Sequence, residues 1–266
     1  MTSVPLRDEQ VVPLKDLAPG VSGLRIAFVN VFGVSHGTGD WTLIDTGLPF
    51  SAHYIRKWAE DTYGVPPAAI VLTHGHFDHV SGAAELAGGW DIPIYAHPRE
   101  FPYLTGVESY PKPNVGAGGG LMSWLSPFYP RGPVDIADRL RAFTPNGDAH
   151  PSPLPGWHVI PTPGHTPGHV SFFRPSDSML LAGDALCTTK PESFFEAALA
   201  QQPELNGPPA YFTWDMDLAA QSIQHLASLQ PQILAPGHGH PTAGGAVTEQ
   251  LEHFAREFAA ARRNAA

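Results

Sequence analysis

The segment 73–79, with the sequence Thr-His-Gly-His-Phe-Asp-His, constrains this chain more than any other feature. Four side chains that can bind a metal ion lie close together in it, directly after a short apolar run. In a tight loop His74 and His76 can turn toward one point, while Asp78 and His79 reach a neighbouring point. Four fixed residue types at this spacing would occur by chance only about 0.002 times in a chain of this length. A metal site is therefore favoured over a histidine-rich surface loop.

Four further motifs each place a His or an Asp immediately after a short apolar run. Strand ends on one edge of a sheet converge, so these side chains can meet although they are distant in sequence. The motifs are Asp45-Thr-Gly, Thr162-Pro-Gly-His165-Thr-Pro-Gly-His169, Gly183-Asp184 and Pro236-Gly-His238-Gly-His240. Together with segment 73–79 they indicate one composite metal site.

Composition limits both the ligands and the partners. Cys187 is the only cysteine, so an intrachain disulfide and a thiolate metal cluster are excluded, and the ligands must be His and carboxylates. The net charge of −10 and the lack of a basic run argue against nucleic-acid binding. No leader pattern and no membrane-length apolar run is visible. We therefore expect a cytoplasmic protein that takes a small-molecule substrate, has no nucleic-acid or membrane partner, and could form a homodimer.

No Ser/Gly linker divides residues 1–266, so we expect one domain with layered helices and strands. Runs of β-branched, aromatic and apolar residues predict strands at 24–32, 41–44, 69–72, 92–96, 157–160, 169–173, 178–182 and 232–235. Helices are predicted over 51–63, 78–87, 217–229 and 246–262. The mixture of Pro, Gly and aromatic residues around 98–155 predicts a pocket-forming insertion.

The five motifs, in this order from Asp45 to His238, resemble the full motif series of the metallo-β-lactamase superfamily. The resemblance implies an α/β (α+β) fold, a four-layer αββα sandwich of two mixed sheets with helices outside. It implies that Asp184 bridges two metal ions, and that Asp45 supports the site without binding metal. His240 is a further candidate for a supporting role. The other implied ligands are His74, His76 and His165 for the first ion, and Asp78, His79 and His238 for the second.

Sites rich in His and carboxylate favour zinc, with iron or manganese as alternatives. Two such ions can share a bridging hydroxide at neutral pH, and Asp78 is the candidate to hold or accept the proton. We predict a metal-dependent hydrolase that acts on an ester, lactone or thioester of a small, partly apolar molecule. A phosphodiesterase, a β-lactamase-like hydrolase and a mononuclear-iron dioxygenase of the same fold are the alternatives.

The substrate is less constrained than the metal site. Asp184 resembles the bridging Asp that lactonases, thioesterases and phosphodiesterases of the superfamily carry. True β-lactamases generally lack this residue. Cys187 stands where N-acyl-homoserine lactonases carry a catalytic Tyr, so that help to the oxyanion would be missing or come from elsewhere. His169 is expected to be a structural histidine at a strand start. Candidate pocket residues are Lys190, Tyr110, Trp124, Phe195 and Tyr211.

Overall fold

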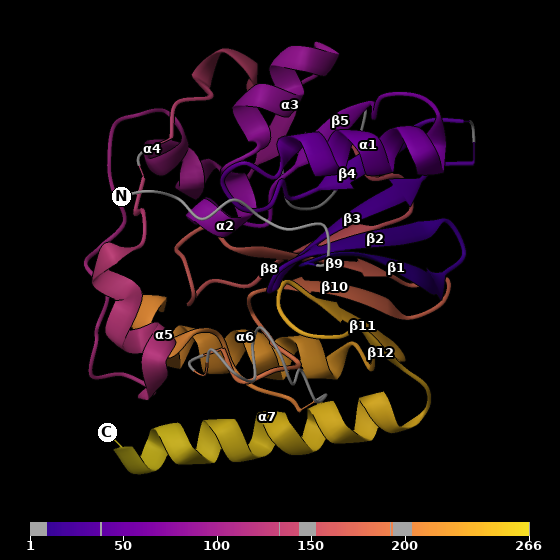
Figure 1. Ribbon diagram of the computed structural model, residues 1–266. Coiled ribbons are helices and arrows are strands. Elements are labelled where there is room, and N and C mark those ends of the chain that lie inside the picture. Colours follow the sequence, from indigo (N-terminus) through magenta and orange to yellow (C-terminus); the bar gives the residue numbers. More distant parts are fainter. Residues whose placement is uncertain are drawn as a thin grey trace.

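Two mixed β-sheets pack face to face, and helices cover the outer face of each (Figure 1). The computed structural model describes residues 10–37, 39–132, 134–143, 153–191, 193 and 204–265. The arrangement confirms the expected four-layer sandwich of two mixed sheets.

The first sheet mixes an antiparallel half with a parallel half. Its strands are β1 (Val11–Ala18), β2 (Val21–Ile26), β3 (Val29–Ser35), β4 (Trp41–Ile44), β5 (Ala69–Val71), β6 (Ile94–Ala96) and β7 (Leu140–Ala142). They lie side by side in chain order, antiparallel from β1 to β4 and parallel from β4 to β7. The parallel half brings the carboxyl ends of β4 and β5 to one edge of the sheet.

The second sheet has the order β12-β11-β10-β9-β8. Its strands are β8 (His158–Pro161), β9 (Val170–Arg174), β10 (Met179–Gly183), β11 (Ile233–Pro236) and β12 (Thr242–Ala243). Only β10 and β11 are parallel neighbours, and the other pairs are antiparallel. The carboxyl ends of β10 and β11 therefore lie together.

Helices form the two outer layers and the connections near the sheet edge. The α-helices are α1 (Ala52–Tyr63), α2 (Phe77–Val80), α3 (Ala83–Trp90), α4 (Phe101–Leu104), α5 (Gly120–Leu125), α6 (Met216–Ser228) and α7 (Ala246–Ala265). Short 3₁₀ turns are η2 (Pro98–Glu100), η3 (Ser126–Phe128), η4 (Ala137–Arg139) and η6 (Ala210–Phe212). Figure 1 shows α1 and α3 above the first sheet, and α6 and α7 below the second.

The alternation of side chains along each strand builds three hydrophobic layers. Leu43 of β4 packs under α1 and α3, whereas the next residue, Ile44, packs between the two sheets. In β10, Leu181 faces the space between the sheets and Leu180 faces α6 and α7. Full burial of one such side chain contributes roughly 1.5–3 kcal/mol to the free energy of unfolding. Both faces of each sheet are therefore covered, which leaves the strand ends free to carry the site.

The run 24–32, expected as one strand, is instead a hairpin of β2 and β3. Ala27 has a positive φ of 55° and turns the chain together with Phe28. The single-strand prediction was wrong because this turn contains no Gly, Pro or Asn to signal it. The turn has a consequence for the site, because it places Phe28 beside the end of β11.

The helix expected over 78–87 is broken into α2 and α3. The break falls at Gly82, where a β-carbon would overlap the backbone oxygen of Thr46. The segment expected as an insertion around 98–155 includes α4 and α5, but it also includes β7, an edge strand of the first sheet. Residues 144–152 of that segment lie outside the described part of the chain.

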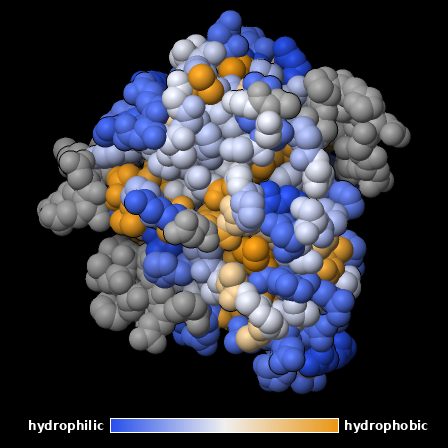
Figure 2. Space-filling model, turned by 90° about the vertical axis from the view of Figure 1, so that its right-hand side faces the viewer, coloured by the Kyte–Doolittle hydropathy of each residue, from blue (hydrophilic) through white to orange (hydrophobic). Residues whose placement is uncertain are grey.

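No helix in the described part of the chain combines the length and apolarity that a bilayer crossing requires. The long helix α7 is amphipathic, with Val247 and Leu251 buried and Arg262 and Arg263 in its last turn. On the face drawn in Figure 2, hydrophobic areas are separated by hydrophilic side chains.

Candidate metal centre

The motif residues gather where strands of both sheets end. Asp45 follows β4, and His74 lies just beyond β5. In the second sheet Asp184 follows β10 and His238 follows β11, while the loop between β8 and β9 supplies His165. Strands β4, β5 and β10 are buried along their whole length, so the rigid sandwich sets the positions of the loops that follow them.

Three imidazole rings from two different loops converge on one point. His76 Nδ1 lies 3.1 Å from His74 Nε2 and 2.8 Å from His165 Nε2. All three side chains are buried, and their nitrogens are close enough together to hold one metal ion. The structure thus brings His74, His76 and His165 together.

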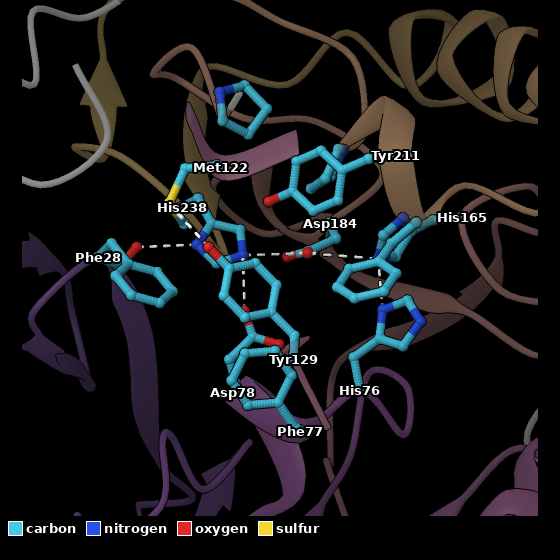
Figure 3. A pocket seen from close by; sticks show the side chains of 13 residues that line it. Phe28, His76, Phe77, Asp78, Met122, Tyr129, His165, Asp184, Tyr211 and His238 are labelled. Atoms are coloured by element: carbon cyan, nitrogen blue, oxygen red, sulfur yellow. Dashed lines mark hydrogen bonds and ion pairs between the residues drawn. The ribbon is translucent and has the colours of Figure 1, made fainter. Parts of the chain in front are cut away.

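A second group of ligand atoms adjoins the first, and Asp184 lies between them (Figure 3). Asp184 Oδ1 is 3.2 Å from His79 Nε2, and its Oδ2 is 3.1 Å from His238 Nε2. The same Oδ2 is 3.5 Å from His165 Nε2. Asp78 completes the group, with Oδ2 3.4 Å from His238 Nε2. One carboxylate therefore faces ligands of both groups.

The donor set fits two divalent cations better than it fits a hydrogen-bonded core. His79 Nε2 and Asp184 Oδ1 are buried and have no hydrogen-bond partner among the described residues, although they face each other at 3.2 Å. His79 Nδ1 lies 2.8 Å from Asp45 Oδ2 and donates to it, so a neutral ring would point the Nε2 lone pair at a carboxylate oxygen. Two acceptors held face to face need a positive charge between them, which a proton on the ring or a metal ion can supply. Nitrogen and oxygen ligands of this kind suit zinc, iron or manganese.

The three-histidine group, which consists of His74, His76 and His165, is neutral at physiological pH. Burial lowers the pKa values of His74 and His165 well below the usual imidazole range, and neighbouring imidazoles lower them further. Burial also lowers the pKa of His76 to about 3. A neutral imidazole is the form that binds a metal ion, so these rings are ready to do so.

The second group attracts positive charge. Burial lowers the pKa of His79, but Asp184, Asp45 and Asp78 outweigh it and raise that pKa well above its usual range. The pKa of His238 is also raised, because Asp184 and Asp78 outweigh the effect of burial. Burial raises the pKa of Asp184, but His238 and His79 outweigh it and hold that pKa well below its usual range. A metal ion that enters here must displace protons from these rings.

Asp45 holds the segment 73–79 at both of its ends, through Thr73 and His79. Its Oδ1 accepts a hydrogen bond from Thr73 N at 2.8 Å, and its Oδ2 accepts from Thr73 Oγ1 at 2.7 Å. Oδ2 also accepts from His79 Nδ1. Asp45 has a positive φ of 59°, a conformation that Asp tolerates better than most residues. The structure places Asp45 against His79 Nδ1, and its supporting role stays a prediction.

His169 turns away from the ligands and holds the backbone of Asp184. Its Nε2 accepts from Asp184 N at 2.9 Å, so the ring proton lies on Nδ1 and is donated to Thr162 Oγ1 at 2.8 Å. Thr162 can then donate to Ser171 Oγ, which donates to Ala182 O at 2.8 Å. Burial lowers the pKa of His169 to about 4, consistent with this neutral ring.

His240 supports the loop of His238 through Arg25. The role of Arg25 could not be predicted from the sequence. Arg25 Nη1 lies 2.9 Å from His240 Nε2, and Arg25 Nη2 donates to Gly239 O at 2.6 Å. Asn30 Nδ2 donates to the same carbonyl at 2.8 Å. An isolated Arg in a strand gives no sequence signal of this role, because most such residues are exposed.

A narrow pocket opens onto the ligands (Figure 3). Apart from the ligands, its walls are aromatic or apolar, and Phe28 stacks on His238 with ring centroids 5.9 Å apart. The wall residues are Phe28, Phe77, Met122, Tyr129, Pro191, Pro209, Tyr211 and Phe212. Several come from turns and short helices whose positions only the folded chain reveals.

The expected pocket residues lie in different places. Tyr211 lines the pocket, whereas Trp124 is 67% exposed and Lys190 is exposed, and neither lines it. Tyr110 is buried behind His76 rather than in the pocket wall, and its hydroxyl donates to Glu100. Phe195 lies outside the described residues.

The sequence is similar to known proteins along most of its length. The family model described as the metallo-beta-lactamase superfamily matches residues 25–238. The probable metallo-hydrolase YflN of Bacillus subtilis (strain 168) is 41% identical over 247 residues, which cover 91% of this chain and 92% of that relative. The probable metallo-hydrolase YybB of the same strain is 32% identical over 201 residues, 75% and 76% of the two chains.

Two solved structures share the fold. The crystal structure of TTHA1623 in a di-iron-bound form is 26% identical with a TM-score of 0.56, covering 90% of this chain and 97% of that one. The BLEG-1 B3 metallo-beta-lactamase is 25% identical with a TM-score of 0.55, covering 81% and 88%.

Proposed function

This chain belongs to the metallo-β-lactamase superfamily and is a metallo-hydrolase, and from that premise we propose that it binds two metal ions and hydrolyses an uncharged ester, lactone or thioester with an apolar substituent. The observation that carries the proposal is the opening of an apolar pocket directly onto a complete set of His and carboxylate ligands.

Two groups of ligand atoms support two ions. The proposed ligands of the first ion are His74, His76 and His165, and those of the second are Asp78, His79 and His238, with Asp184 shared. When bound, two such ions supply a nucleophilic hydroxide at neutral pH and polarise the carbonyl under attack. Zinc is the first choice for these ligands, and the di-iron form of the neighbour TTHA1623 makes iron the main alternative.

Asp78 is the proposed proton acceptor. It lines the pocket and lies in the second ligand group, where its Oδ2 can take a proton from the attacking water and return it to the leaving group. Burial raises the pKa of Asp78, while His79 and His238 lower it, and the net direction is upward. A bound metal ion would lower this pKa, so the proposed role of Asp78 rests on its position at the pocket and beside the other ligands.

The walls of the pocket select the substrate. Among the described residues that line it, none is Lys or Arg. A substrate that buries an anionic group against these walls, out of reach of the metal ions, would leave that charge unpaired, which costs several kcal/mol. An uncharged acyl group meets no such cost and gains from burial against Phe28, Phe77 and Phe212.

We expect neutral esters and lactones to be hydrolysed at least about 10²-fold faster, as kcat/KM, than analogues that differ only by an added carboxylate. The measurement is a panel of matched neutral and anionic esters and thioesters, with a phosphodiester and a β-lactam. His76→Ala, which removes a proposed ligand, is the control and should abolish every activity that belongs to the site. Activity unchanged in His76→Ala would refute the proposal. A preference for the phosphodiester would show that phosphodiesters, and not esters, lactones or thioesters, are the substrate class.

A further inference from the structure

The carboxylate of Glu100 lies in the interior at the junction of η2 and α4, and no motif of the sequence includes it. The side chain has no exposed surface. His97 begins the turn that presents it, because its Nδ1 accepts from Arg99 N and Pro98 occupies the first position. The backbone is thereby fixed before Glu100 reaches inward.

Both oxygens of Glu100 accept two hydrogen bonds. Oε1 accepts from Thr166 Oγ1 at 2.8 Å and from Gly168 N at 2.7 Å. Oε2 accepts from Gly75 N at 3.1 Å and from the Tyr110 hydroxyl. Four donors around one carboxylate match its acceptor capacity, and bonds to a charged acceptor are the strong kind.

These donors belong to the two loops that supply the three-histidine group. Gly75 lies between His74 and His76, whereas Thr166 and Gly168 follow His165 closely. One side chain therefore ties the first loop to the second across the site.

Two glycines leave the space that Glu100 and its partner occupy. A β-carbon at Gly168 would lie 2.8 Å from Glu100 Oε1, and one at Gly75 would lie 2.7 Å from the Tyr110 oxygen. Tyr110 is itself held by Tyr103, whose ring stacks on it at 3.9 Å. The rings of Tyr110 and His76 also meet, in an edge-on arrangement with centroids 4.5 Å apart. The loops, the carboxylate and the phenol thus fit closely.

We propose that Glu100 is a positioning residue that sets the separation of His76 and His165, and through it the metal affinity of the three-histidine group. The proposal rests on the metal site proposed above. The second group is held by other partners, because Asp45 binds His79 and the Phe28 carbonyl accepts from His238 Nδ1 at 2.8 Å. Loss of Glu100 should therefore weaken one metal site and spare the other.

Glu100→Gln is the test, because it keeps the shape but turns an NH₂ group toward two donors. The metal retained per chain is measured against a graded chelator, together with urea unfolding of the metal-free protein. We expect one of two metals to be lost at chelator concentrations about 10–100-fold lower than for wild type, with the other unchanged. The loops stay joined at their base, where Val170 N donates to Thr73 O at 3.0 Å, so the variant should fold.

Glu108→Gln is the matched control, since Glu108 is an exposed glutamate in the same segment, and it should behave as wild type. If Glu100→Gln does not fold, Thr166→Val decides, because it removes one of the four donors and should weaken the same site less. Equal weakening of both sites, or of neither, would overturn the role of Glu100. Wild-type protein that holds no metal would instead refute the proposed metal site, so the two failures are distinguishable.

Discussion

Asp184→Asn is expected to lower kcat/KM for the best ester or lactone by at least about 10³-fold, and to leave fewer than two metals per chain. The reason is geometric and electrostatic. Asp184 is 2% exposed, faces His79, His165 and His238, and contributes a charge on which the second ligand group depends. An amide of the same shape keeps the packing but removes that charge.

The control for this substitution is Asp61→Asn, which removes the same charge from an exposed residue of α1. Its ion pair with Lys57 is a surface pair of the kind that contributes little to stability. We expect wild-type activity and metal content there. An Asp184→Asn protein that keeps both metals and most of its activity would show that the carboxylate is not shared between two ions.

Gly237→Ala is expected to lower activity about 10²-fold through a displacement of the ligands. A β-carbon at this position would overlap Asp184 Oδ1 and lie 2.9 Å from His79 Cε1, so a ligand must move. The added methyl should also cost about 1–3 kcal/mol of stability, as overpacking does. Activity and metal content of the purified variant are the measurements, and thermal unfolding checks the fold.

Gly245→Ala is the matched control, because a β-carbon there meets nothing within 4 Å. That variant should keep wild-type metal content and activity. If Gly237→Ala does the same, the positions of Asp184 Oδ1 and His79 are not required for metal binding, and our description of the site is wrong.

The helices and strands could be predicted wherever apolar residues repeated at helical spacing over many residues, or where a strand was fully apolar. Helix α6 and the strands β4 and β5 lie within a residue or two of their expected bounds. Helix α7 begins at the expected residue but extends further at its C-terminal end. Prediction failed where a local signal was absent. The turn at Ala27 lacks the usual turn residues, and β7 is three residues long and two of them are exposed.

The residues of the site also fall into those that a local sequence signal reveals and those that it does not. Motif residues could be recognised because each stands in a short pattern after a strand. Glu100, Arg25 and Phe28 could not be, since each acts on a loop that is distant in sequence and none belongs to a repeated local pattern. Tyr110 was expected in the pocket on its aromatic character alone, whereas the structure turns its hydroxyl toward Glu100.

The metal content of wild-type protein, purified without added metal and measured by elemental analysis alongside ester hydrolysis, tests the central claim most directly. We predict two metal ions per chain, loss of hydrolysis when a chelator removes them, and recovery when two equivalents are restored. A single tightly held iron, or full hydrolytic activity in protein stripped of metal, would contradict the proposal of a two-metal hydrolase.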